Sequence, residues 1–241
     1  MKQVFLLSCF FILIFTSSFS QDITHIYDPY AVKREVGQFH QLVVSGPFRI
    51  MVKQGKEVGL AVSSENVELR DAIEVNVKDG VLRIKFGGAK KLNMKGKARA
   101  VIYVSVTEID SMNLSGVSSL VTDGQLAVTS LGISISGASD LDGAIQAERL
   151  NIRQSGASDV KLKGNVNIMN VQLSGASDLK AFDLISNSCH AVISGASDMK
   201  INVSRHLEAK VSGASDLRYS GNPASANVKS TGASTVKQIN K

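Results

Sequence analysis

From residue 111 onward, apolar and polar residues alternate with a period of two, and the pattern recurs about every nineteen residues. We aligned the repeats on the first residue of a recurring Ser-Gly-Ala-Ser-Asp motif, which is threonine in the last copy. The positions three and one before it are mainly apolar, and the position between them is mainly polar. A period of two indicates a strand with one buried face, whereas helices have a period of 3.6. The two apolar columns are Met112, Ile133, Ile152, Val171, Ala191, Ala209 and Val228, and Leu114, Ile135, Gln154, Leu173, Ile193, Val211 and Ser230.

The alternation resumes after each motif, so a second strand is predicted to follow it. Seven copies of the motif occur, at steps of 21, 19, 19, 20, 18 and 19 residues. Repeats with a constant phase indicate an all-β solenoid whose turns, here called rungs, stack as parallel strands. The predicted inward residues after the motif are Leu120, Leu141, Val160, Leu179, Met199, Leu217 and Val236.

The motif is predicted to form a corner of each rung. Glycine between two small residues suits a corner at which φ is positive and a Cβ has no room. The corner glycines are Gly116, Gly137, Gly156, Gly175, Gly195, Gly213 and Gly232.

The segment from residue 36 to 110 alternates less regularly, and we expect it to cap the first rung within a single domain over 36–238. Its Ser45-Gly46-Pro47 segment is interpreted as a degenerate corner. Asp79-Gly80 between two apolar strands predicts a type I′ hairpin, which is not a parallel rung. Residues 111–238 form the regular repeats, and polar residues in the inward columns near the C-terminus predict a polar last rung.

The N-terminus is predicted to be a secretory signal peptide over residues 1–20, followed by an extended linker over 21–35. Lys2 precedes an apolar run that ends at Phe15, and small residues surround the predicted cleavage point. A transmembrane anchor is the less favoured alternative because the run is shorter than the roughly 20 residues of a span. The chain is expected to be exported and to be periplasmic, outer-membrane-associated or extracellular, with no transmembrane segment after cleavage.

The two cysteines have different expected fates. Cys9 ends a Leu-Leu-Ser-Cys segment typical of lipoprotein cleavage sites, but cleavage there leaves an apolar mature N-terminus, so lipidation is a secondary alternative. Cys189 is predicted to be a buried small hydrophobe rather than a reactive thiol. Its column, five positions before the motif, is apolar and contains Leu131, Leu150, Met169, Cys189, Leu207 and Ala226.

The formal net charge of +6 arises in part from a basic, glycine-containing segment that is predicted to be a loop. We interpret it as a solvated loop, with contact to anionic polysaccharide or membrane headgroups as the alternative. The chain has no Trp and no aromatic residues interleaved with this segment, which argues against nucleic-acid binding. The basic residues are Lys90, Lys91, Lys95, Lys97 and Arg99.

The repeats also align two columns of charge, here called the Asp file and the Lys file. Stacked carboxylates repel one another, so cationic neighbours, motif hydroxyls such as Ser158 and Ser177, or turn N–H groups are expected to offset the repulsion. The two files are our candidate partner-binding surface. They contain Asp140, Asp159, Asp178, Asp198 and Asp216, and Lys161, Lys180, Lys200, Arg218 and Lys237, with Asp142 as an exception in the second file.

No cofactor is expected. Calcium along the Asp file is an alternative, but the Gly-Gly-x-Gly-x-Asp signature is missing and each rung supplies one carboxylate. Catalysis needs a singular cluster of groups, and five copies of one Asp argue for corner geometry instead. The histidines share no repeat column and are predicted to lie at the surface. They are His25, His40, His190 and His206, of which His190 aligns with Asn151, Asn170 and Asn227.

These features together resemble the family called putative auto-transporter adhesin, head GIN domain, of secreted and surface proteins in Bacteroidetes. The resemblance covers residues 36–238 and implies a right-handed parallel β-helix, an adhesin-like role and no established catalytic residues. Shared segments are Phe39-x-x-Leu42-x-Val44-x-Gly46, Lys53-Gln54-Gly55, Asp79-Gly80-Val81-Leu82-x-Ile84 and Val101-x-Tyr103-Val104.

We therefore expect a non-enzymatic, secreted or cell-surface binding or structural module. Its expected partner is an extracellular glycan, a protein or a second copy of the chain. The alternative is a glycan-active enzyme, similar to a polysaccharide lyase or hydrolase, built on a β-helix.

Overall fold

The computed structural model describes residues 28–87 and 100–239, which form strands and one short helix. The elements are β1 (Ala31–Arg34), β2 (Gln41–Gly46), β3 (Phe48–Gln54), β4 (Gly59–Ser63), α1 (Val67–Asp71), β5 (Ile73–Lys78), β6 (Val81–Phe86), β7 (Ala100–Val106), β8 (Ser111–Gly116), β9 (Ser119–Ile135), β10 (Asp140–Gln154), β11 (Asp159–Leu173), β12 (Asp178–Ile193), β13 (Asp198–Val211), β14 (Asp216–Ser220), β15 (Ser225–Ser230) and β16 (Thr235–Gln238).

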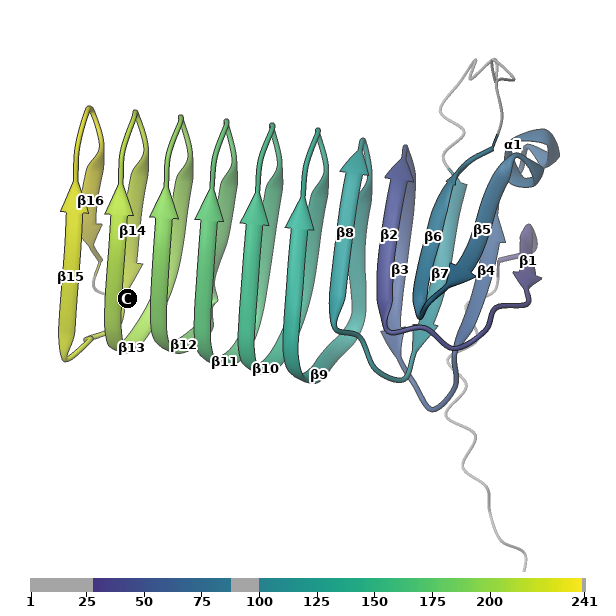
Figure 1. Cartoon of the computed structure of the whole chain (residues 1–241), viewed down its shortest axis with the longest axis horizontal. Coiled ribbons are helices and arrows are strands. Elements are labelled where there is room, and N and C mark those ends of the chain that lie inside the picture. Colours follow the sequence, from purple (N-terminus) through teal and green to yellow (C-terminus); the bar gives the residue numbers. More distant parts are fainter. Residues whose placement is uncertain (1–27, 88–99, 240–241) are drawn as a thin grey trace, which may run out of the picture.

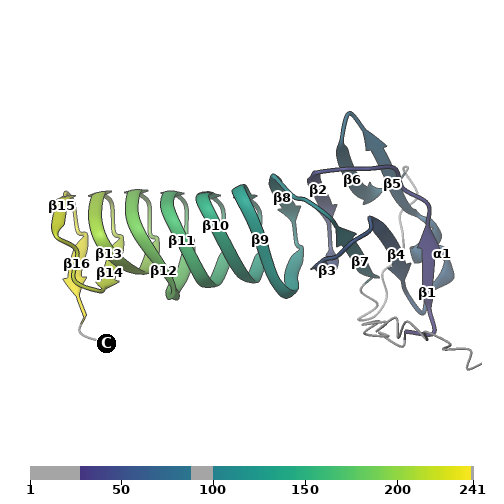
Figure 2. The ribbon, with the colours of Figure 1, turned by 90° about the horizontal axis from the view of Figure 1, so that it is seen from below.

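The regular part is a parallel β-solenoid, as the repeats predicted. Each long strand runs down one side, bends, and returns up the other side to a tight corner, so successive rungs stack along the long axis (Figures 1 and 2). β10 pairs in parallel with β9 and β11, and its pairing skips Glu148, where the strand bends. We call the sheet face that follows the corner the Asp/Lys face and the one that precedes it the return face.

The predicted inward columns form the core. Met112, Ile133, Leu141 and Val160 are at most 2% exposed. In the last rung, however, Val228 and Val236 are only partly buried. Cys189 is buried as predicted, and this burial raises the pKa of its thiol to about 12. The thiol is therefore shielded and protonated at neutral pH, as expected of a core residue.

The Ser-Gly-Ala-Ser segment forms the corner, as predicted, and its backbone is in close contact with the backbone of the corner in the previous rung. Gly175 has φ of +80°, and a Cβ built on it lies 2.6 Å from the carbonyl oxygen of Gly156 in the previous rung. The amide of Ala176 donates to the same carbonyl at 2.8 Å. Glycine is thus required twice, once by φ and once by the stacking distance.

Two rungs at the N-terminal end are not in chain order. The rung of β2 and β3 lies between that of β6 and β7 and that of β8 and β9, because β2 pairs in parallel with both β6 and β8. Ser45-Gly46-Pro47 is the predicted degenerate corner, since Gly46 pairs with Gly116. Pairing between segments distant in the chain therefore builds the start of the solenoid.

The Asp79-Gly80 hairpin is confirmed, but one inference from it was wrong. Asp79 and Gly80 both have positive φ, 53° and 72°, as a type I′ turn requires, and β5 pairs antiparallel with β6. However, β6 itself is a parallel rung strand, paired with β2. The hairpin thus joins a rung to the cap.

Antiparallel strands and α1 cap the N-terminal end. β4 pairs antiparallel with β7, and β1 pairs antiparallel with β4. Residues 31–34, which we predicted to be part of an extended linker, therefore form a strand of the sheet. The side chain of Tyr103 helps to hold this strand in place. Its hydroxyl donates to Asp28 at 2.8 Å beside this strand, and burial together with this hydrogen bond raises the pKa of Tyr103 to about 12.

The last rung is polar, as predicted. Ser230 and Gln238 occupy inward columns, where the Ser230 hydroxyl contacts that of Ser234 at 2.7 Å and the Gln238 amide donates to the Gly221 carbonyl. The predicted signal peptide and basic loop lie outside the described residues. Within those residues no helix has the length and apolar character needed to cross a membrane.

Substitution of a corner glycine is predicted to cost more stability than substitution of a glycine that only needs positive φ. Gly175→Ala combines an unfavourable φ with a backbone clash, whereas Gly124 has φ of +87° and nothing within 4 Å of a built Cβ. We expect Gly124→Ala to cost about 1–2 kcal/mol and Gly175→Ala at least about 2 kcal/mol more. Chemical denaturation measures both values, and equal losses would contradict the stacking constraint.

Candidate binding surface

The structure places the Asp file and the Lys file side by side on the Asp/Lys face. Asp140, Asp159, Asp178, Asp198 and Asp216 are register partners in consecutive strands. Lys161, Lys180, Lys200, Arg218 and Lys237 are likewise partners, two residues further on. All ten side chains belong to exposed or half-buried residues. The corner fixes this register, because in each of these rungs the Asp directly follows the corner and the Lys or Arg comes two residues later.

The charge lattice predicted for this face forms only in part. Lys180 pairs with Asp159 at 3.3 Å and with Asp178 at 3.6 Å, and Arg218 pairs with Asp216 at 3.4 Å. The hydrogen bond to Asp159 is the main cause that raises the pKa of Lys180. Asp142, the exception in the Lys file, lies 4.0 Å from Lys161. These pairs are exposed, so each contributes little to stability.

The motif hydroxyls have a different role from the one we expected. Ser158 and Ser177 are buried, and their hydroxyls donate to the carbonyls of Ser155 and Ser174 within their own corners. Our expectation that they donate to the Asp carboxylates was wrong, because these serines point into the corner while the Asp side chains point out. The second serine of the motif is therefore a structural residue.

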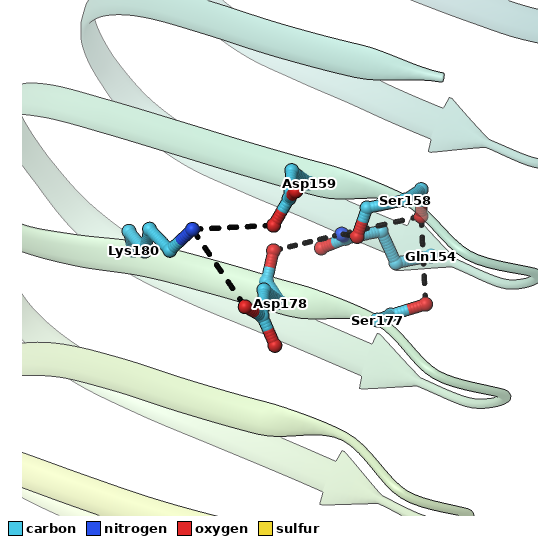
Figure 3. A network of polar contacts seen from close by, with 6 residues as sticks. All are labelled: Gln154, Ser158, Asp159, Ser177, Asp178 and Lys180. Atoms are coloured by element: carbon cyan, nitrogen blue, oxygen red, sulfur yellow. Dashed lines mark hydrogen bonds and ion pairs between the residues drawn. The ribbon is translucent and has the colours of Figure 1, made fainter. Parts of the chain in front are cut away.

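Gln154 connects the two sheet faces behind the charged files (Figure 3). This buried residue lies on the return face, and its amide donates to the carbonyls of Ser158 at 2.8 Å and Asp178 at 3.0 Å. Its Oε1 has no partner in the described part of the chain. Its place in an apolar column was visible in the sequence, but its contact across the core was not.

A groove that we did not predict runs along the bends, away from the corners. We call it the bend groove; its volume is about 760 Å³. Residues 108–110 line part of it, and the bends of β9, β10, β11 and β12 form its length. In the sequence its only signal is a polar column at the bend. This column contains Thr129, Glu148, Asn167 and Asn187.

The described histidines lie at the surface, as predicted, and two of them face carboxylates. His40 contacts Asp110 at 2.8 Å, and His190 contacts Glu208 at 3.4 Å on the return face. His206 is exposed, and His25 lies outside the described residues. Across residues 28–87 and 100–239, no three His, Cys, Asp or Glu side chains gather closely enough to hold a metal ion.

The sequence pattern of one family, described as "Putative auto-transporter adhesin, head GIN domain", matches residues 38–223. The chain belongs to this family. The match spans the degenerate corner, the hairpin and nearly all of the repeats, so the resemblance noted in the sequence is confirmed. No protein of curated function matches the chain.

Solved structures with this fold come from Bacteroides and Parabacteroides species. A putative adhesin from Bacteroides fragilis NCTC 9343 has a TM-score of 0.80 and 24% identity, covering 87% of this chain and 96% of its own. A putative adhesin from Parabacteroides distasonis ATCC 8503 has a TM-score of 0.68 and 20% identity, with the same coverage. A putative lipid binding protein from that organism has a TM-score of 0.66, 17% identity and again 87% and 96% coverage. At these identities the likeness shows the shared fold.

Removal of divalent ions is predicted to leave the GIN-family solenoid unchanged in stability. The Asp file offers one carboxylate per rung, and Lys180 already pairs with two of these carboxylates. We expect the same melting temperature with a chelator and with millimolar calcium. A rise with calcium that is lost in Asp159→Asn/Asp178→Asn would contradict this prediction and place ions on the file.

Proposed function

We propose that this GIN-family protein is a non-enzymatic, exported binding module that contacts an external partner through its Asp/Lys face. The family name supports an adhesin-like role at the cell surface or outside the cell. The observation that carries the proposal is the register of the two charged files, which holds charges of both signs in parallel rows.

The geometry of this face favours many weak contacts over one strong contact. Strands of one sheet lie about 4.8 Å apart, so equivalent side chains recur at that spacing. Exposed ion pairs contribute roughly 0.2–1 kcal/mol each, so a useful affinity requires several rungs to act together. A rigid sheet supports this because its strands need no ordering when a partner binds.

The balance of charge on the face indicates the kind of partner. With Asp142 counted, the two files contribute six carboxylates and five cationic groups, so the charges nearly balance, and Lys180 sits between two carboxylates. A partner that carries charges of both signs complements such a face better than a uniformly charged polymer. A protein surface, a zwitterionic glycan or a second copy of the chain has this character.

Partner binding is predicted to depend on the Asp/Lys face and on salt. The first step is a screen of the exported chain against a glycan array and cell-envelope proteins, followed by affinity measurements on the partner found. Asp178→Asn/Lys180→Gln removes one carboxylate and one ammonium from the face, and we expect a roughly threefold to tenfold loss of affinity. Added salt is expected to weaken binding by the wild type.

The matched control is Glu208→Gln/Lys210→Gln, which removes the same two kinds of charge from exposed positions on the return face. It is expected to bind as the wild type does. Equal losses of affinity in the two variants, or an affinity that does not change with salt concentration, would contradict a role for the Asp/Lys face.

A further inference from the structure

The bend groove has the size and shape of a ligand site. Its volume of about 760 Å³ falls within the range of roughly 300–1,000 Å³ found for small-molecule sites. Four consecutive bends line it, and three steps of about 4.8 Å give a length of about 14 Å. It lies on the side of the solenoid opposite the corners, so a ligand there leaves the Asp file uncovered.

The floor of the groove is apolar, and its rims are polar except at Ile185. Ala147 and Val166 turn inward at the bends and remain 7% and 5% exposed, and Ile185, which is in register with Asn165 on the rim, is 48% exposed. Gln146 and Asn165 stand on the rim toward the Asp/Lys face. The opposite rim carries Glu148, Asn167 and Asn187.

Hydrogen bonds hold that second rim in one arrangement. Asn167 donates to Glu148 Oε2 at 3.3 Å, and Asn187 donates to Asn167 Oδ1 at 3.0 Å. Ser204 from the next rung donates to Asn187 Oδ1 at 3.0 Å. An amide has two N–H donors and a carboxylate has two oxygens, so each of these groups keeps capacity for a ligand. Their order is established before any ligand binds, which lowers the entropy cost of binding.

The charge of the groove excludes anionic ligands. Glu108, Asp110 and Glu148 are among its lining residues, and none of the described lining residues is Lys or Arg. The His40 contact to Asp110 offsets one of these charges only when the imidazole is protonated. A phosphate, sulfate or carboxylate group would therefore meet acceptors without a matching cation.

Most of the backbone that lines the groove is already paired, which argues against an extended peptide. The bends of β10 and β11 pair with each other through Ala147 and Val166. At the first bend the Gln54 side chain takes the place of a strand: its amide donates to the Ala127 carbonyl at 3.1 Å and its Oε1 accepts from the Ala127 amide at 2.8 Å. Peptides bound by strand addition need a continuous row of unpaired backbone groups, whereas here the pairing skips only single residues such as Glu148 and Asn167.

We propose that the bend groove binds a neutral, hydroxyl-rich glycan. Sugar hydroxyls donate to the free oxygen of Glu148 and exchange hydrogen bonds with the amides of Asn167 and Asn187. The C–H face of a sugar ring packs on Ala147, Val166 and Ile185. This site is separate from the Asp/Lys face, so its occupancy does not depend on the partner proposed there.

Neutral oligosaccharides provide the test. The full chain is titrated with short linear glucans, mannans, galactans and xylans, and with uronic-acid and sulfated oligosaccharides of similar length. We expect at least one neutral series to bind, with affinity rising until the chain fills the groove, and the anionic series not to bind. The variant Asn167→Ala/Asn187→Ala is expected to lose roughly tenfold in affinity, as two or more hydrogen bonds are removed.

A second asparagine pair gives a matched control. Asn170 donates to Asn151 at 2.9 Å on the return face, outside the groove, so Asn151→Ala/Asn170→Ala removes the same groups. This control and Asp178→Asn/Lys180→Gln are expected to bind the oligosaccharide as the wild type does, with melting temperatures confirming that all variants fold.

Several outcomes would overturn the proposal. These are no binding of any neutral series by folded wild-type protein, a preference for the anionic series, or equal losses in the two asparagine variants. Shortened oligosaccharides after incubation, lost in Asn167→Ala/Asn187→Ala, would support the site while contradicting the non-enzymatic function.

Discussion

The close approach of glycine backbones at the corners is the constraint on which the structure depends. In the corners from Ala138 to Ala214 the Ala amide donates to the glycine carbonyl of the previous rung, as Ala157 does to Gly137 and Ala176 to Gly156, both at 2.8 Å. A side chain at the glycine has no space, and φ there is positive. The corner therefore fixes the phase of every residue near it, which is why the inward columns and the two charged files keep their register.

Variation in rung length is absorbed away from the corner. The pairing of β12 with β13 shifts between Ala181 and Ile185 and again between Ser186 and Ser188, while the pairs from Asp178↔Asp198 to Lys180↔Lys200 stay in step. As a result the surface near the corner is repetitive and the surface near the bend is not. The two proposed sites differ accordingly. The Asp/Lys face suits a repetitive partner, and the bend groove presents one particular set of side chains.

The sequence predicted those parts of the structure that repeat or that depend on local turn chemistry. Column alignment identified the core residues, the corner and the Asp and Lys files, and the Asp79-Gly80 pair identified the hairpin. Parts that depend on contacts between distant segments were not predictable. β6 joins β2, and β1 joins β4, through backbone pairing that leaves no local pattern. The polar rim from Glu148 to Asn187 had a column signal, but the groove is also lined by Glu108, Ile109 and Asp110, which lie outside the repeats.

Amide hydrogen exchange at the corners shows whether glycine stacking sets the register of the rungs. Tight surface turns usually exchange quickly because their amides face water, whereas paired amides in a cooperative core exchange only through larger openings. We expect the amides of Ala157, Ala176, Ala196 and Ala214, each bonded to a glycine carbonyl at 2.8 Å, to exchange as slowly as the strand amides of β10 to β13. Rapid exchange at these four alanines, while the strands stay protected, would contradict this expectation. It would show that strand pairing, and not the corner contacts, fixes the register of the rungs.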